Sequence, residues 1–256
     1  KSEAMTTHNA LYKYLLFLGD NGLIQGHRLS ELCSNGPILE EDLAMTNLAL
    51  DHIGRAQAFL KYAGEVEGKG RTEDDLAYKR GEREFYNNLI AELPNGDFAC
   101  TIARMLIVSS FEYLLFTALC TSKNATIAAI AAKAVKEAKY HFIHSRDWCY
   151  RLGKGTEESH RRLQNGFNEF WMFTGELFEM DADFAALAND GISADLTALK
   201  PQWLALVQPI LADSNIAIPN VDYMQTGSRN GIHTEYLGHI LSEMQYLQRA
   251  YPDAKW

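Results

Sequence analysis

The stretch that decides the fold is NATIAAIAAKAVKEAKYHFIHSRDWCYRLG, residues 124–153. Asn124 is a residue type that caps helix starts, and Gly153 accepts the left-handed conformation that ends a helix. Between them, apolar residues recur at intervals of three and four, which is the spacing of one face of an α-helix: Ile127, Ile130 and Ala134. The pattern therefore predicts one long helix over residues 125–152.

The same periodicity recurs in three earlier stretches and predicts helices over about 7–32, 39–62 and 97–120. Gly36 and Pro37 end the first of these. The segment between the second and third helices, residues 71–95, carries two short helical pieces and a turn, so it is one long crossover. Two helix hairpins joined by a single crossover are the layout of a ferritin-like bundle.

The remainder of the chain predicts accessory helices at about 157–179, 202–211 and 235–249. The first of them carries an aromatic stripe formed by Phe167, Phe170, Trp171 and Phe178. No strand-like alternation persists long enough to indicate a sheet. We predict an all-α fold: a ferritin-like four-helix bundle over about 7–152, additional C-terminal helices over about 157–256, and a single domain over 1–256.

Composition excludes several classes of function. The net charge is −9, and Lys and Arg are scattered among acids, which argues against nucleic acid. The four cysteines lie far apart, as in proteins of a reducing compartment. The N-terminal residues lack the apolar core of a signal peptide, and the most apolar run, residues 103–120, is interrupted by Arg104 and Glu112. We expect a cytoplasmic protein with a buried helix there and no membrane span.

Each bundle helix places a carboxylate where its apolar stripe should continue. The four acids are Asp20, Asp51, Glu112 and Glu137, and His141 follows on the next turn of the last helix. A buried acid is costly unless it is paired or bound to a cation. In carboxylate-bridged di-iron proteins, this bundle supplies one Glu from each of two helices and Glu-x-x-His from each of the other two. The acids are therefore candidates for a di-iron site.

The di-iron pattern is incomplete. The second helix has Asp51-x-x-Gly54 and the fourth has Glu137-x-x-Tyr140, so both lack the imidazole at i+3. His141 is one residue late, which is a rotation of about 100° around the helix. We interpret the four acids and His141 as the remains of a di-iron site, and we predict no bound metal and no catalytic residue in this chain.

Plainer interpretations compete with this one. A solvated position is the alternative for two of the acids, Asp20 and Glu112, and Asp51 with Asn47 is a candidate for a simple polar pair. Two histidines are more often satisfied interior residues than ligands, His141 and His144. Two others lie beside charged residues, so we expect them to be solvated: His52 and His160.

If the acids are buried without a metal, nearby cations should replace it, because like charges raise each other's pKa in a low-dielectric interior. The candidates for Glu137 are His141 and Lys133, the candidate for Asp51 is Arg55, and the candidate for Asp20 is His27. Such a polar cluster would set the helix register with little net gain in stability over an apolar core.

Several segments carry a family resemblance over nearly the full length of the chain. They are Leu18-Gly-Asp-Asn21, Leu50-Asp51 with Gly54 and Gln57-Ala58, Pro94-Asn-Gly96 with Phe98-Ala99, Lys136-Glu-Ala-Lys-Tyr-His141, Thr174-x-Glu176-Leu-Phe178, Gly231-Ile-His-Thr-Glu235, and Leu237-Gly238 with Ser242-Glu-Met-Gln-Tyr-Leu-Gln-Arg249. The chain resembles the PaaC-type subunits of bacterial phenylacetyl-CoA oxygenases, the ring epoxidases of phenylacetate catabolism.

The resemblance implies a ferritin-like fold and a tight complex with a homologous catalytic subunit that holds the di-iron centre. It also implies a small bridging subunit and a reductase that brings electrons from NADPH. The complex would be an oxidoreductase that epoxidises the ring of phenylacetyl-CoA. The PaaC-type subunit is regarded as structural, so this chain would be non-catalytic and would carry no cofactor.

Two other functions stay open. One is an oxygenase subunit with its own degenerate carboxylate site, and the other is an independent ferritin-like protein. Oligomeric ferritins need two complete metal-ligand hairpins or an acid-rich channel, and neither is evident in the sequence. For the complex, we expect a large apolar interface, with the aromatic stripe and the C-terminal segment as suitable material. Packing of the stripe inside the chain is the rival explanation.

Overall fold

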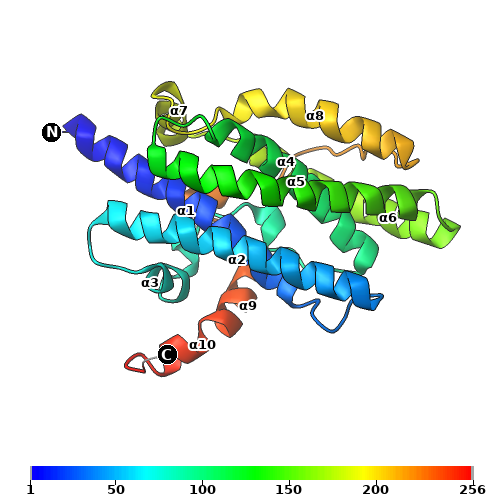
Figure 1. The fold of residues 1–256 in the computed structure, drawn as a ribbon, viewed down its shortest axis with the longest axis horizontal. Coiled ribbons are helices and arrows are strands. Elements are labelled where there is room, and N and C mark those ends of the chain that lie inside the picture. Colours follow the sequence, from blue (N-terminus) through cyan, green and yellow to red (C-terminus); the bar gives the residue numbers. More distant parts are fainter. Residues whose placement is uncertain (1, 255–256) are drawn as a thin grey trace. The chain divides into compact units, whose positions relative to one another are not determined.

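The computed structural model describes residues 2–254, and within them the chain forms ten α-helices, five short 3₁₀ helices and no strand (Figure 1). The all-α class is therefore confirmed. The chain divides into two compact units. Unit 1 consists of Lys1–Pro94 and Gly227–Trp256, and unit 2 of Asn95–Thr226. The prediction of a single domain over residues 1–256 stays a prediction.

The long hairpin of unit 1 consists of α1 (Ser2–Ser30) and α2 (Leu39–Glu67), which pack along their length (Figure 1). Small residues on α1 allow this close approach. A Cβ added at Gly22 would lie 2.8 Å from the His52 carbonyl oxygen, and one added at Gly26 would lie 2.6 Å from Ile53 Cδ1. Larger side chains at either position would force the two helices apart.

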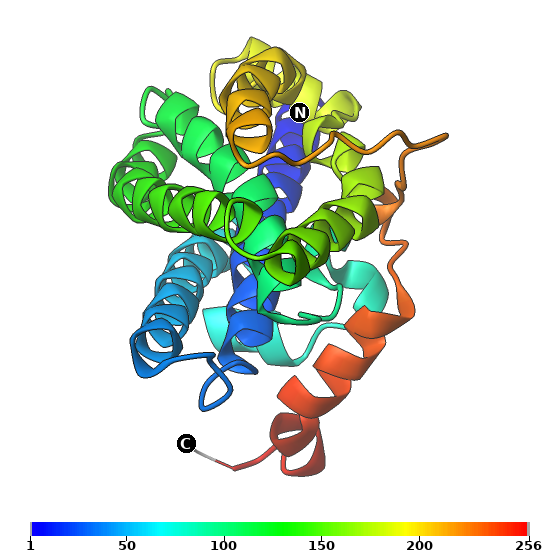
Figure 2. The same cartoon turned by 90° about the vertical axis from the view of Figure 1, so that its right-hand side faces the viewer.

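The rest of unit 1 is the crossover and the C-terminal arm. The crossover contains α3 (Glu73–Tyr78), η1 (Glu82–Glu84) and η2 (Leu89–Ala91), which is three short helical pieces where two were predicted. The arm contains η5 (Ser228–Asn230), α9 (Glu235–Met244) and α10 (Tyr246–Ala250), drawn in red in Figure 2. The predicted last helix is thus two helices, because the helical geometry is interrupted at Gln245.

The long hairpin of unit 2 consists of α4 (Phe98–Leu119) and α5 (Ala125–Gly153). Asp97 caps α4 by accepting from the Cys100 N–H, and Asn124 caps α5 as predicted. By length and composition α4 could cross a membrane, but 78% of its most apolar window is buried in the structure. That burial is typical of a core helix.

The other helices of unit 2 are α6 (Glu157–Phe170), η3 (Trp171–Phe173), η4 (Gly175–Phe178), α7 (Ala182–Asn189) and α8 (Leu196–Asp213). The segment after α8, orange in Figure 2, contains no helix before residue 227. The predicted helix 157–179 is shorter and passes into 3₁₀ turns. In turn, α8 is longer than the predicted 202–211, and the two prolines inside it, Pro201 and Pro209, are both exposed.

The four rings of the aromatic stripe are all buried inside unit 2. Phe178 packs edge-on against Phe111, with ring centroids 5.6 Å apart, and lies 5.5 Å from the ring of Trp203. The Trp203 indole N–H donates to the Ser110 hydroxyl at 2.8 Å. The stripe therefore belongs to the core of this unit, and the expectation that it forms an intermolecular interface is wrong.

Candidate functional site

The Asp20 carboxylate is completely buried near the middle of α1, and protein donors occupy both of its oxygens. Arg80 Nη1 donates to Oδ2 at 3.1 Å, and Arg80 Nη2 donates to Oδ1. The Tyr86 backbone N–H also donates to Oδ2, at 3.0 Å. The alternative of a solvated Asp20 is thus wrong, and its cation comes from the crossover.

Arg80 is itself held rigidly, at 1% exposure. Its Nε donates to the Leu76 carbonyl at 2.5 Å and its Nη1 donates to the Glu84 carbonyl at 2.7 Å. The guanidinium also lies over the Phe85 ring, 4.1 Å from the centroid. A planar, bidentate, stacked arginine is the side chain best suited to pair with a buried carboxylate.

His27, the sequence candidate for this role, has a different partner. Its Nδ1 donates to the Leu23 carbonyl at 2.9 Å, one turn earlier on the same helix. Burial lowers the pKa of His27, although the Leu23 carbonyl and Glu31 partly oppose that shift. The prediction that His27 compensates Asp20 is therefore wrong.

On α2, the second helix of unit 1, the candidate residues are Asp51 and Arg55. Asp51 is partly buried, and Gly54 is exposed, so no side chain occupies the i+3 position. His52 is only 4% exposed, which overturns the expectation that it is solvated. It faces inward because it lies one turn from the buried Leu48. Arg55 lies 2.5 Å from His52 Nδ1, and because a guanidinium can only donate, this ring nitrogen is the acceptor.

In unit 2, the structure brings two of the candidates together. Glu112 on α4 is 5% exposed and His141 on α5 is 1% exposed. A carboxylate oxygen of Glu112 and a ring nitrogen of His141 lie within 4.8 Å. The two residues form a buried polar pair between the antiparallel helices, and the alternative of a solvated Glu112 is wrong.

Glu137, the second candidate acid in unit 2, lies nearer the surface than Glu112. Its side chain is 17% exposed, and its Oε1 lies 3.8 Å from Lys133 Nζ, so the predicted pairing with that lysine is present. Lys133 itself is 79% exposed, which makes this a weak, screened pair. Tyr140, at the position where an i+3 ligand would stand, is 54% exposed.

The sequence interpretation missed another buried acid, Glu92, which lies in the crossover. Both of its carboxylate oxygens bind the C-terminal arm. His233 Nδ1 lies 2.5 Å from Oε1, and the backbone N–H and hydroxyl of Thr234 donate to Oε2 at 2.8 and 2.7 Å. Asn87 also donates to Oε1, at 3.0 Å. The signal lay in the segment Gly231-Ile-His-Thr-Glu235, whose His and Thr are the two partners.

Both ring nitrogens of His233 face acceptors, because Nε2 lies 2.8 Å from the Phe85 carbonyl oxygen. Only the imidazolium form can donate from both nitrogens. Burial works to lower the pKa of His233, but the hydrogen bond and charge of Glu92, together with the Phe85 carbonyl, outweigh it and raise the pKa. The arm is thus fastened to the crossover by a buried ion pair.

A glycine makes this fastening sterically possible. Gly231 has a φ of +67°, and a Cβ added there would lie 2.3 Å from the Arg83 carbonyl oxygen. Any other residue would be strained by its backbone conformation and would also collide with the crossover.

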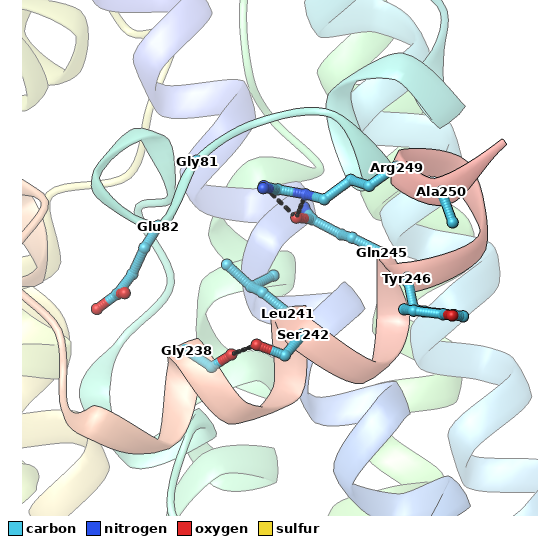
Figure 3. A pocket seen from close by; sticks show the side chains of 9 residues that line it. All are labelled: Gly81, Glu82, Gly238, Leu241, Ser242, Gln245, Tyr246, Arg249 and Ala250. Carbon is cyan, nitrogen blue, oxygen red and sulfur yellow. Dashed lines mark hydrogen bonds between the residues drawn. The ribbon is translucent and has the colours of Figure 1, made fainter. Parts of the chain in front are cut away.

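A pocket of about 660 Å³ lies between η1 and the arm, as Figure 3 shows. Leu241 is one of its lining residues, and two of its polar side chains, Gln245 and Arg249, bind within the chain. The Gln245 amide donates to the carbonyls of Ala77 and Arg80 at 3.1 and 3.0 Å, and Arg249 donates to Gln245 Oε1 at 2.7 Å. Glu82 and Ser242 both line the pocket, but the Ser242 hydroxyl donates to the Gly238 carbonyl at 2.7 Å and not to the Glu82 carboxylate.

Comparison with known proteins places these features in a family. Residues 1–256 match the family described as Phenylacetic acid catabolic protein, PaaA_PaaC. The chain belongs to this family. It is 46% identical over 248 residues to one of the subunits of the 1,2-phenylacetyl-CoA epoxidase of Escherichia coli strain K12, a match that covers 97% of this chain and 100% of that relative.

In this member of the PaaA_PaaC family, the ferritin-like positions do not fit a di-iron centre. A bridging carboxylate needs a free oxygen for each metal, whereas both oxygens of Asp20 bind Arg80 and one also binds the Tyr86 N–H. Gly54 has no side chain to coordinate with, and Tyr140 is mostly exposed. Among the described residues, Asp20, Gly54 and Tyr140 therefore offer no open ligands for a di-iron centre.

Proposed function

We propose that this chain is a non-catalytic, structural subunit of a multicomponent phenylacetyl-CoA epoxidase in aerobic phenylacetate catabolism. It supports a homologous catalytic subunit that holds the di-iron centre. The observation that carries the proposal is the Asp20 carboxylate, which is saturated by Arg80 and the Tyr86 N–H. The identity with the Escherichia coli epoxidase subunit supports the assignment to this complex.

The energetics of Asp20 favour a fixed ion pair over metal binding. To coordinate a metal, the carboxylate would have to release Arg80 inside a region where both side chains are at most 1% exposed. Breaking a buried pair costs about 3–5 kcal/mol, because a charge is left without compensation. A metal bound by Asp20 would have to offset that cost.

In this proposal the epoxidation is catalysed by the complex as a whole and not by this chain. The homologous subunit supplies the di-iron centre, a small bridging subunit joins the assembly, and a separate reductase delivers electrons from NADPH. The complex acts in the cytoplasm and uses no nucleic acid or membrane partner. This chain keeps its own helices in a fixed register, for which buried ion pairs are suited even when they add little net stability.

Metal analysis of the chain purified alone, after a chelator wash, tests the proposal. We expect far less than one iron per chain, while the homologous subunit treated in the same way retains its iron. Two irons per chain would overturn the non-catalytic assignment. Co-purification of the two subunits tests the scaffold role, and an isolated chain that ignores the homologue would favour an independent ferritin-like protein.

A protein with its own degenerate metal site is the second candidate function. The observation that favours it is the buried Glu112–His141 pair in unit 2, because an imidazole and a carboxylate are both good ligands for divalent metals. Titration of the chelator-washed protein with Fe²⁺ or Zn²⁺ decides between the two. Tight binding that is lost in His141→Ala would favour this second function.

A further inference from the structure

One face of α2 is exposed and uncharged over five turns. Its positions follow each other at intervals of three and four residues, and we refer to them as the α2 leucine face: Leu39, Leu43, Asn47, Leu50, Gly54 and Gln57. The three leucines are 70%, 56% and 63% exposed, and Ile38, directly before the helix, is 51% exposed. Charge returns to this face only at Lys61.

This composition is unusual for the outer face of a surface helix. A helix that packs one side against its own chain normally carries charged and polar residues on the opposite side. The other side of α2 does face the protein interior, with residues such as Met45, Leu48 and Phe59 fully buried. Single exposed leucines need no explanation, but three leucines on one face, with only uncharged residues between them, indicate a binding surface.

Gly54 adds an independent argument for close contact at this face. Glycine destabilises the interior of an exposed helix relative to alanine. At Gly22 and Gly26 the neighbouring helix leaves no room for a Cβ, whereas a Cβ at Gly54 would meet nothing within 4 Å. The chain's own packing thus does not require this glycine. A gap in the side-chain layer there allows another backbone to approach α2.

The charges beside the face indicate which kind of partner fits. Glu40 is exposed, and Asp42 and Asp51 are partly buried at the two edges of the row. Arg55, which is the only Lys or Arg between Leu39 and Gln57, is buried on the other side of the helix. A second copy of this chain would place acids against acids in an antiparallel or parallel pair, and its net charge of −9 would add repulsion.

We propose that the α2 leucine face is the docking surface for a helix of a different protein, one with an apolar stripe bordered by Lys and Arg. This inference rests on the proposed function, in which that protein is the homologous subunit. A stable interface buries about 800 Å² on each partner, with an apolar centre and a charged rim. The leucines form the centre and Glu40, Asp42 and Asp51 form the rim.

The affinity of the purified chain for the homologous subunit tests the surface. Leu50→Glu and Leu43→Glu should each weaken binding about 30-fold or more, which is the effect of a central anchor residue. Both positions are exposed, so circular dichroism melts should stay close to wild type. The matched control is Ile218→Glu, an apolar residue of unit 2 that is 46% exposed, and it should bind as the wild type does.

Two further variants test the partner's chemistry. Gly54→Leu should weaken binding by blocking the close approach, with no loss of folding, since its Cβ meets open space. Glu40→Lys should weaken binding and flatten its dependence on salt concentration. Unchanged affinity in both variants, together with leucine variants that bind normally, would overturn the surface while leaving the proposed function intact.

Other outcomes separate the remaining explanations. A wild-type chain that does not bind the homologous subunit would overturn the proposed function, and the docking inference with it. Sedimentation of the chain alone tests whether a second copy of this chain binds the α2 leucine face. A dimer of this chain that Leu50→Glu dissociates would assign the face to a second copy and overturn the proposed partner.

Discussion

Replacing Arg80 by leucine is the sharpest test of the idea that a buried ion pair between Asp20 and Arg80 stabilises unit 1. In the wild type, Arg80 neutralises Asp20 at two contacts and also donates to the carbonyls of Leu76 and Glu84. Arg80→Leu leaves the carboxylate in the interior with the Tyr86 N–H as its remaining donor. Protonation or entry of water then has to offset the lost charge.

The expected loss follows from this burial. Removing one partner of a buried pair costs about 3–5 kcal/mol, and two carbonyls that lose their donors add to that loss. Since domains are stable by only about 5–15 kcal/mol, Arg80→Leu should remove a large fraction of the stability. The double variant Asp20→Leu with Arg80→Leu should lose less than the sum of the single variants, because no charge is stranded.

Urea unfolding followed by circular dichroism at neutral pH measures these losses. Lys79→Leu is the matched control one residue away. Lys79 is 57% exposed and its Nζ lies 2.6 Å from Asp75, so its removal should cost no more than about 1 kcal/mol. If Arg80→Leu costs no more than Lys79→Leu, or if the Asp20 and Arg80 losses are strictly additive, the reasoning is refuted.

Three further predictions concern the other polar groups. The pKa of His233 in the folded protein is raised above its ordinary 6.5, so the stability that this residue contributes is complete below pH 6.5 and is lost as the pH rises through the raised pKa. The urea midpoint of the wild type should therefore fall with rising pH. His233→Gln should be less stable than the wild type at low pH, and its urea midpoint should depend less on pH. In a thermodynamic cycle, Glu112→Gln and His141→Ala should be coupled by at least about 0.5 kcal/mol, and independent losses would mean that the two do not interact. Lys133→Ala should change the unfolding free energy by less than about 1 kcal/mol, since its partner contact is solvent-exposed, and a larger loss would show that its contact with Glu137 is stronger than its exposure implies.

Local signals predicted the long helices well. Asp97 and Asn124 accept hydrogen bonds from backbone N–H groups two or three residues later in the chain, so the starts of α4 and α5 are determined by residues close in sequence. Inward positions of Glu112 and His141 followed from helical periodicity in the same way. A boundary or a face is set by a few neighbouring side chains, and a single sequence contains them.

Partners from distant parts of the chain were not predictable by these means. Arg80 stands 60 residues from Asp20, in a crossover whose path no local pattern specifies. His27 was closer in sequence and had the right charge type, but its position on α1 directs it to its own backbone. His52 has charged neighbours in sequence, yet helix geometry turns it toward the interior. Proximity in sequence and proximity in space differ at all three residues.

The binding of Glu92 by the C-terminal arm has a consequence for synthesis of the protein. Residues 95–226 of unit 2 lie between the two parts of unit 1 in the chain, so the ribosome makes Glu92 some 141 residues before His233. All residues of unit 2 are synthesised, and this unit can begin to fold, before the residues of the C-terminal arm that bind the crossover have been made. A nascent chain stalled before residue 233 would carry a finished unit 2 and an acid that cannot be buried in unit 1. That intermediate is the form that chaperones and proteases would meet.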